Sequence, residues 1–255
     1  TMKLAQDLYE AGLITYMRTD SLNIADQAIK QIRTFVDKKF GQANLSENAR
    51  TFKTKSKLSQ EAHEAIRPSD VNVLAESIKF DEKHQRLYRL IWQRTLATQM
   101  KEARVESVKV SIEVEGYLFQ LNGQRLLGKG YLEVYPEQFT EALIPELTVG
   151  QQLFLESLNA EQKFTEPIAR FTEASLIKAL ESYGIGRPST YAPIISTITS
   201  RNYIEKEGRS LVPTDTGMVV IKLLKKHFGQ IVDTNFTAQI ENDLDSIAQG
   251  EKDWI

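Results

Sequence analysis

The spacing of hydrophobic residues changes twice along the chain. Over most of residues 2–100 they recur every three or four positions, which is typical of helices with one buried face. Apolar and polar residues then alternate, as they do in a half-buried strand, before the helical spacing returns. These changes predict an α+β, multi-domain chain: a mainly helical domain over residues 1–103, a β-rich segment over 104–168 and a second helical domain over 169–255.

Turn and capping residues set the expected bounds of the elements. Helices are expected over residues 2–11, 24–40, 82–100, 173–182, 188–198, 219–227 and 236–248. Strands are expected over residues 103–115, 118–121, 131–135 and 147–158, with turns at Gly116 and Asn122-Gly123, and as a short pair around Gly208. Asn23 and Thr172 are expected to cap the helices that follow them.

Composition excludes several classes of protein. The 255 residues include no cysteine, so disulfide bonds and thiolate metal sites are excluded and the cytoplasm is the expected compartment. No apolar run reaches the ~20 residues of a membrane span, and the start has no signal-peptide pattern. The net charge of −2 argues against indiscriminate nucleic-acid binding, but 32 lysines and arginines are enough for a local basic groove. We interpret the chain as a piece of a longer protein.

The first candidate for chemistry is the stretch over residues 12–21, Gly-Leu-Ile-Thr-Tyr-Met-Arg-Thr-Asp-Ser. It places the phenol of Tyr16 two residues from the guanidinium of Arg18. A phenol is a poor nucleophile at its ordinary pKa of about 10, so it requires a base or positive charge nearby. A guanidinium supplies that charge and can donate two hydrogen bonds to a phosphate. The pair fits attack on a phosphodiester, but spacing alone favours a buried tyrosine beside a surface arginine.

The second candidate is the stretch over residues 59–70, Ser-Gln-Glu-Ala-His-Glu-Ala-Ile-Arg-Pro-Ser-Asp. Zinc is not expected here, because no second histidine follows His63 four residues on. A phosphate contact by His63 and Arg67 suits their charges better, and a structural histidine is the alternative. The three lysines within residues 53–57 either lie in a solvated loop or contact phosphate.

The third candidate is the stretch over residues 184–191, Gly-Ile-Gly-Arg-Pro-Ser-Thr-Tyr. It precedes a predicted helix, and free amides at a helix start form a phosphate site. Arg187, Ser189 and Thr190 would add a charge and two hydroxyls. The order over residues 172–211 (helix, glycine turn, helix, two short strands) is also that of a winged helix, so a non-enzymatic module that binds duplex DNA is the rival interpretation.

Taken together, these three stretches resemble motifs of the type IA DNA topoisomerases, in that family's order. Residues 213–217, Pro-Thr-Asp-Thr-Gly, also look like that family's. Met17 and Ser21 resemble the bacterial topoisomerase I branch. Ser69 departs from the threonine usual in the family but keeps the hydroxyl. The resemblance covers most of the chain.

The resemblance implies a function and roles for particular residues. Tyr16 would attack a single-strand DNA phosphate to form a 5′-phosphotyrosine link, with Arg18 and His63 as further catalytic residues. The other strand would then pass and the break would be resealed without ATP, relaxing negative supercoils. The remaining site residues are expected to bind DNA: Gln6, Glu10, Thr15, Thr19, Asp20, Arg67, Arg187, Ser189 and Thr190. The β-rich segment would form an arch that links the tyrosine-bearing domain to the second helical domain, around a hole that holds DNA.

The resemblance also implies partners. Single-stranded DNA is the expected substrate, in the bacterial nucleoid. Magnesium is expected to bind a separate acidic domain of the same protein, and no metal site or bound cofactor is expected within this chain. We expect the chain alone to bind single-stranded DNA weakly and to be unable to relax supercoils.

Overall fold

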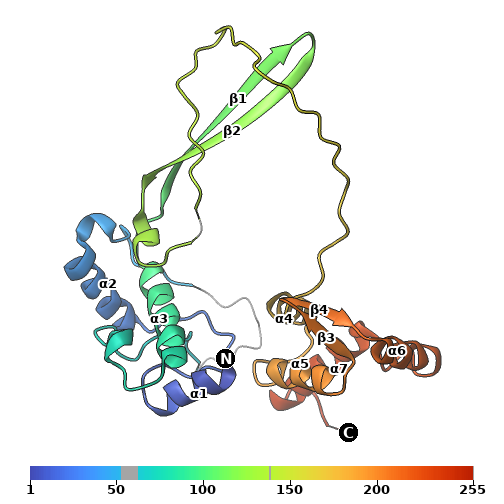
Figure 1. Cartoon of the computed structure of the whole chain (residues 1–255). Coiled ribbons are helices and arrows are strands. Elements are labelled where there is room, and N and C mark those ends of the chain that lie inside the picture. The colour runs from blue at the N-terminus through green and yellow to red at the C-terminus, as the bar shows by residue number, and fades with distance from the viewer. Residues whose placement is uncertain (53–62, 138, 255) are drawn as a thin grey trace. The chain divides into compact units, whose positions relative to one another are not determined.

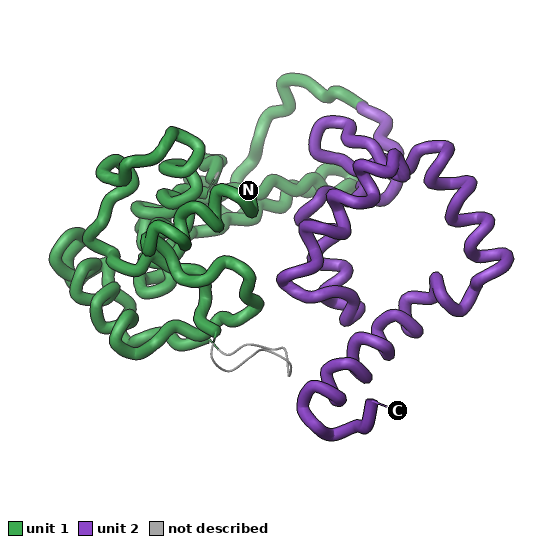
Figure 2. Tube along the Cα trace, turned by 90° about the horizontal axis from the view of Figure 1, so that it is seen from below, with its two compact units in different colours: residues 1–160 green, residues 161–255 purple. Residues whose placement is uncertain are grey.

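The computed structural model describes residues 1–52, 63–137 and 139–254. The chain forms two compact units, residues 1–160 and 161–255 (Figure 2). Seven α-helices and two two-stranded antiparallel sheets lie within the described ranges, so the predicted α+β, multi-domain class is confirmed. The domain boundaries at residues 103 and 168 stay predictions. The expected lysine contacts within residues 53–57 lie outside the described residues.

Three helices form the lower part of the first unit: α1 (Met2–Glu10), α2 (Asp26–Phe40) and α3 (Glu82–Ala97) (Figure 1). Their bounds agree closely with the hydrophobic spacing. The expected cap at Asn23 is wrong, because α2 begins later and Ala25 is its N-cap residue. The Ala25 N–H instead donates to the carboxylate of Glu64, 2.7 Å away.

Helix α3 connects two hydrophobic clusters. At one end Tyr88 packs with residues of α1, and at the other Leu96 packs with residues of α2. The Tyr88 hydroxyl donates to the carbonyl of Val73 at 3.0 Å, and burial followed by the nearby Asp70 charge raises its pKa to about 12. Burying a side chain of this size contributes about 1.5–3 kcal/mol. The fully buried residues of the two clusters include Leu8, Ile14, Ile32, Val36, Tyr88, Leu96 and Met100.

A histidine also joins α1 to α3. The ring of His84 lies between two carboxylates, with Nε2 3.0 Å from Asp7 of α1 and Nδ1 2.7 Å from Asp81. The hydrogen bond to Asp7, followed by the one to Asp81, raises the pKa of His84 above its ordinary value of 6.5. The protonated ring can donate to both carboxylates at once, so protonation strengthens the contact between the two helices.

The contribution of His84 to stability is expected to fall as the pH rises. A raised folded-state pKa stabilises the folded state fully below the unfolded pKa, and this stabilisation is lost as pH passes the folded value. The melting-temperature gap between the wild type and His84→Gln should therefore be widest near about pH 5.5 and narrow above about 6.5. Thermal denaturation across this range tests it, with His227→Gln, an exposed histidine, as the control. A gap that widens with pH would contradict the assignment.

The β-rich part of the first unit is one long hairpin, β1 (Arg104–Val114) and β2 (Tyr117–Gly128). Its turn lies at Glu115 and Gly116, both with positive φ, as two-residue hairpin turns require. The turn expected at Asn122-Gly123 is wrong, because β2 runs straight through it. Gly123 is needed there for a different reason: a Cβ atom on it would lie 2.6 Å from the side chain of Ile144.

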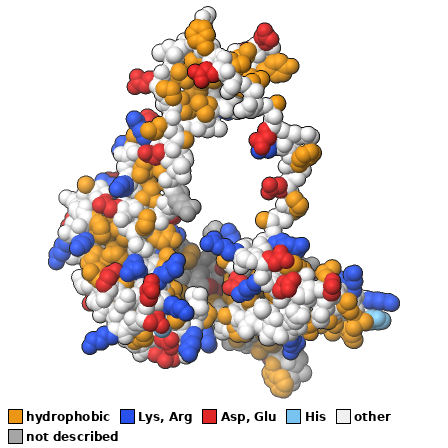
Figure 3. Space-filling model, in the orientation of Figure 1, with side chains coloured by type: hydrophobic (Ala, Val, Ile, Leu, Met, Phe, Trp, Pro, Cys, Tyr) orange, Lys and Arg blue, Asp and Glu red, His pale blue; other side chains and the backbone are white. Residues whose placement is uncertain are grey.

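Three further strand expectations need correction. Residues 130–133 form a 3₁₀ turn, so the strand over 131–135 is wrong. Residues 147–158 contain no strand. The half-buried alternation in β1 holds only in part: Val110 and Ile112 are half-buried, but Val108 and Val114 are 44% and 49% exposed. Hydrophobic side chains gather at the top of Figure 3 over the hairpin. Alternation predicts a strand, but burial requires a second layer against one face.

The second unit has the predicted order of elements: α4 (Glu173–Ser182), α5 (Tyr191–Ser200), β3 (Ile204–Glu207), β4 (Ser210–Pro213), α6 (Asp215–His227) and α7 (Thr234–Ala248) (Figure 1). Thr172 caps α4 as expected, in a capping box with Ser175. Pro188 lies in the turn before α5 and not in its first turn, because α5 begins at Tyr191.

Candidate functional site

The loop that carries Tyr16 is fixed from both ends. Gly12, with a φ of 71°, ends α1 and turns the chain back, and its N–H donates to the carbonyl of Tyr9 at 2.8 Å. Ile14 and Met17 are only 2% and 7% exposed, so they anchor the loop in the core on either side of Tyr16. Burial of these neighbours leaves the Tyr16 ring half-buried at the edge of the core.

The structure brings the first two sequence motifs together. Ile14 and Pro68 form an antiparallel bridge, and the Thr15 N–H donates to the carbonyl of Arg67 at 2.9 Å. The Thr15 hydroxyl donates to the carbonyl of Ala65 at 2.7 Å and accepts from the Arg67 N–H at 2.9 Å. Thr15 was expected to contact DNA, but in this structure its hydroxyl joins the two motifs.

The Tyr16 ring contacts two other aromatic rings. The centroid of the Tyr16 ring lies 5.6 Å from that of His63, at an interplanar angle of 45°. The Tyr16 ring also contacts the ring of Tyr9 in α1. The two centroids lie 5.2 Å apart and the interplanar angle is 67°, which is an edge-on contact. Such contacts contribute about 0.5–1.5 kcal/mol and fix ring orientation. Tyr9 was not identified from the sequence, since only the turn at Gly12 brings it back to the loop.

The two arginines of these motifs lie in different environments. Arg18 is exposed, and no described residue pairs with its guanidinium. The side chain of Arg67 is only 16% exposed: Nη2 donates to Glu64 at 2.6 Å and Nη1 to the carbonyl of Pro68 at 3.0 Å. Glu64 thereby links Arg67 to the start of α2, a role that sequence reasoning missed although Glu64 precedes Arg67 by only three residues. Arg18 is therefore the better placed of the two to hold an external anion.

The remaining expected residues of the first unit lie around this centre. The Thr19 hydroxyl accepts from the N–H of buried Ser21 at 3.0 Å, which shapes the end of the loop. Asp20 is half-buried. Gln6 and Glu10 lie one turn apart on the exposed face of α1, where the Gln6 amide donates to the Glu10 carboxylate at 2.8 Å.

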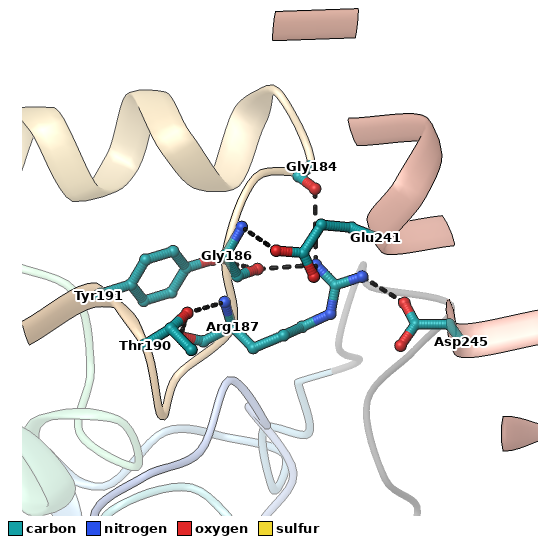
Figure 4. A network of polar contacts seen from close by, with 7 residues as sticks. All are labelled: Gly184, Gly186, Arg187, Thr190, Tyr191, Glu241 and Asp245. Atoms are coloured by element: carbon teal, nitrogen blue, oxygen red, sulfur yellow. Dashed lines mark hydrogen bonds and ion pairs between the residues drawn. The ribbon is translucent and has the colours of Figure 1, made fainter. Parts of the chain in front are cut away.

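The third motif lies in the second unit, in the turn between α4 and α5. Ser189 and Thr190 are exposed, and the Thr190 hydroxyl accepts from the Arg187 N–H at 2.8 Å. The Arg187 guanidinium points to α7, where it pairs with Glu241 and Asp245 (Figure 4). The expected phosphate site thus has two exposed hydroxyls, but its guanidinium already has acidic partners.

The described residues contain no cluster of three or more His, Asp or Glu side chains placed to hold a metal ion. Among the same residues, no helix is long and apolar enough to cross a membrane. A phenol in contact with a histidine ring, on a loop that also carries an exposed guanidinium, has the groups for nucleophilic attack on an anionic ester.

Comparison with known proteins agrees with this chemistry. The family described as DNA topoisomerase matches residues 1–255. The chain is 43% identical over 264 residues to DNA topoisomerase 1 of Campylobacter jejuni, matching all of this chain and 38% of that protein. It is 45% identical over 265 residues to DNA topoisomerase 1 of Synechococcus elongatus, again over all of this chain and 30% of the relative. It therefore spans about a third of the length of these relatives.

A solved structure is similar too. Full-length topoisomerase I from Thermotoga maritima superposes with a TM-score of 0.81 at 34% identity, covering 98% of this chain and 42% of that one. The match at family level spans the whole chain and includes all three motifs. The chain therefore belongs to the DNA topoisomerase family, in its bacterial type IA topoisomerase I branch.

Proposed function

We propose that this chain carries the nucleophile of an ATP-independent DNA topoisomerase that cleaves one strand, passes the other and reseals the break, relaxing negative supercoils. The observation that carries the proposal is the Tyr16 ring held 5.6 Å from His63 by paired motifs. The relatives named DNA topoisomerase 1 and the exposed guanidinium of Arg18 support it.

In the proposed reaction the Tyr16 oxygen attacks a phosphorus atom of one strand. A bond forms between the phenolic oxygen and phosphorus as the bond from phosphorus to the 3′ oxygen breaks. The phenolic proton is released and the departing 3′ oxygen gains a proton, so the products are a 5′-phosphotyrosine ester and a 3′-hydroxyl. Attack by that hydroxyl reverses the step. The ester keeps the energy of the phosphodiester, so no nucleotide is consumed.

Two side chains would stabilise the transferring phosphoryl group. Arg18 would donate to its non-bridging oxygens, where negative charge develops during attack. His63 would donate to the same phosphate or to its neighbour. Gln6, Glu10 and Asp20 would position the strand and the loop, and Ser189 with Thr190 would hold the backbone further along.

The proposed partners are single-stranded DNA and an acidic domain of the same protein that binds magnesium. The donor set of this chain does not fit a magnesium site, because the described residues offer no cluster of three carboxylate or imidazole groups. No step is therefore assigned to the metal within this chain. The bacterial nucleoid is the proposed location.

A binding competition separates this function from a duplex-binding winged helix. Labelled single-stranded oligonucleotide should bind the chain more tightly than a hairpin duplex of the same sequence. Fluorescence anisotropy at two salt concentrations measures both affinities, since nucleic-acid affinities depend strongly on salt. Substituting the exposed Arg209, between β3 and β4, with Ala is the control: it should affect duplex binding only if the strand pair acts as a wing. Preference for the duplex would contradict the proposal.

A further inference from the structure

The turn over residues 184–190 is tied to α7 by ion pairs. Glu241 and Asp245 lie four residues apart, on the same face of α7. Nη1 of Arg187 is 3.5 Å from the Glu241 carboxylate, and Nη2 donates to Asp245 (Figure 4). One guanidinium of the turn is thus held by two carboxylates from a helix more than fifty residues further along the chain.

The side chains of Arg187 and Glu241 also hold the backbone of the turn. The Gly186 N–H donates to the other oxygen of Glu241 at 3.1 Å. Nη1 of Arg187 donates to the carbonyl of Gly186 at 2.7 Å and lies 3.5 Å from that of Gly184. Both glycines have positive φ, of 71° and 81°. Arg187 and Glu241 therefore enclose a backbone conformation that other residues rarely adopt.

Charge and burial both disfavour a phosphate on this guanidinium. The side chains of Arg187, Glu241 and Asp245 are 26%, 27% and 29% exposed. One guanidinium beside two carboxylates gives the cluster a net charge of about −1 at neutral pH. The Nε atom of Arg187 is buried and has no hydrogen-bond partner among the described residues, so it cannot reach an external ligand without rearrangement.

We propose that Arg187 is a positioning residue, which joins the 184–190 turn to α7 and does not act as a phosphate clamp. Its N–H donates to the Thr190 hydroxyl, so the guanidinium anchor also sets the position of Thr190. Phosphate contacts at this turn then come from the exposed Ser189 and Thr190. The DNA-binding part of this inference rests on the proposed function, whereas the anchor does not.

A double-mutant cycle tests the anchor without DNA. Arg187→Met keeps the apolar stem, and Asp245→Asn keeps the shape while removing the charge. In the full 255-residue chain each should reduce amide-exchange protection at Gly186 about tenfold, the equivalent of about 1.4 kcal/mol. The double variant should be no worse than the more severe single variant, because both remove one interaction. Lys206→Met, which breaks an exposed pair with Glu173 in the same unit, should leave Gly186 unchanged. Fully additive losses would overturn the anchor.

A second measurement separates an anchor from a clamp by the sign of the effect. If Arg187 is an anchor, two variants should weaken binding of labelled single-stranded oligonucleotide: the single variant Arg187→Met, and the double variant that combines Glu241→Gln with Asp245→Asn. The salt dependence should not change, since no phosphate contact is lost. A clamp predicts the opposite: neutral α7 side chains would tighten binding, and Arg187→Met would reduce the salt slope by about 0.7. Failure of the wild type to bind single strands counts against the proposed function, while the exchange cycle still decides the anchor.

Discussion

Replacing Tyr16 with Phe is expected to abolish the proposed covalent link between the chain and DNA. The test mixture contains the chain, the proposed acidic domain, magnesium and a labelled single-stranded oligonucleotide, and an SDS quench traps any adduct. Phe keeps the ring contacts with Tyr9 and His63 but has no nucleophilic oxygen. Loss of a nucleophile costs roughly 10⁴-fold or more, which takes the adduct below detection on a gel.

Tyr9→Phe is the matched control for this result. Tyr9 is the other phenol at the site, 41% exposed and in edge-on contact with Tyr16. Its ring contact survives the substitution, so adduct formation should stay near the wild-type level. Loss of the adduct in Tyr9→Phe, together with its retention in Tyr16→Phe, would show that the nucleophile is Tyr9 and not Tyr16.

The second large effect is expected from Thr15→Val, which keeps the shape of the side chain and removes its hydroxyl. The Ala65 carbonyl and the Arg67 N–H then lose their partner. Each unsatisfied group costs about 1–3 kcal/mol. Because these bonds hold the Tyr16 loop against the His63 segment, adduct formation should also fall about 10²-fold, as is usual for displaced reactive groups. Chemical denaturation and the adduct assay measure the two effects.

Two variants control for this result. Thr15→Ser keeps the hydroxyl and should restore most of both properties. Thr34→Val removes a hydroxyl that donates only to the Lys30 carbonyl on the exposed face of α2, and it should change neither. An adduct yield in Thr15→Val equal to that of the wild type would show that the bonds between the two motifs do not position the nucleophile.

Local signals predicted much of the secondary structure. The helices were predictable because their periodic apolar residues and end signals act over a few residues, as in Thr172 with Ser175. The prediction of a turn at Asn122-Gly123 was wrong because the glycine is needed there for the close approach of Ile144, which is distant in sequence. The prediction of a strand over residues 147–158 was wrong because hydrophobic composition alone cannot specify a pairing partner for a strand.

In the candidate site, too, contacts between sequence neighbours were easier to predict than contacts between distant residues. The resemblance to a family, and not the spacing, singled out Tyr16, Arg18 and His63 as catalytic residues, and the structure places Tyr16 beside His63. The partners of the other arginines were less visible. Glu64 is three residues from Arg67, a spacing that signals an ion pair, but Asp245 is 58 residues from Arg187 and only the fold brings them together.

The adduct assay on the wild-type chain, with and without the proposed acidic domain supplied in trans, decides whether Tyr16 is the nucleophile of a cleavage centre that needs a second domain. We expect an SDS-stable adduct only when that domain and magnesium are present, with the DNA attached to the peptide that contains Tyr16. An adduct formed by the chain alone, or attached to another residue, would contradict the assignment of a cleavage centre divided between Tyr16 and a separate acidic domain.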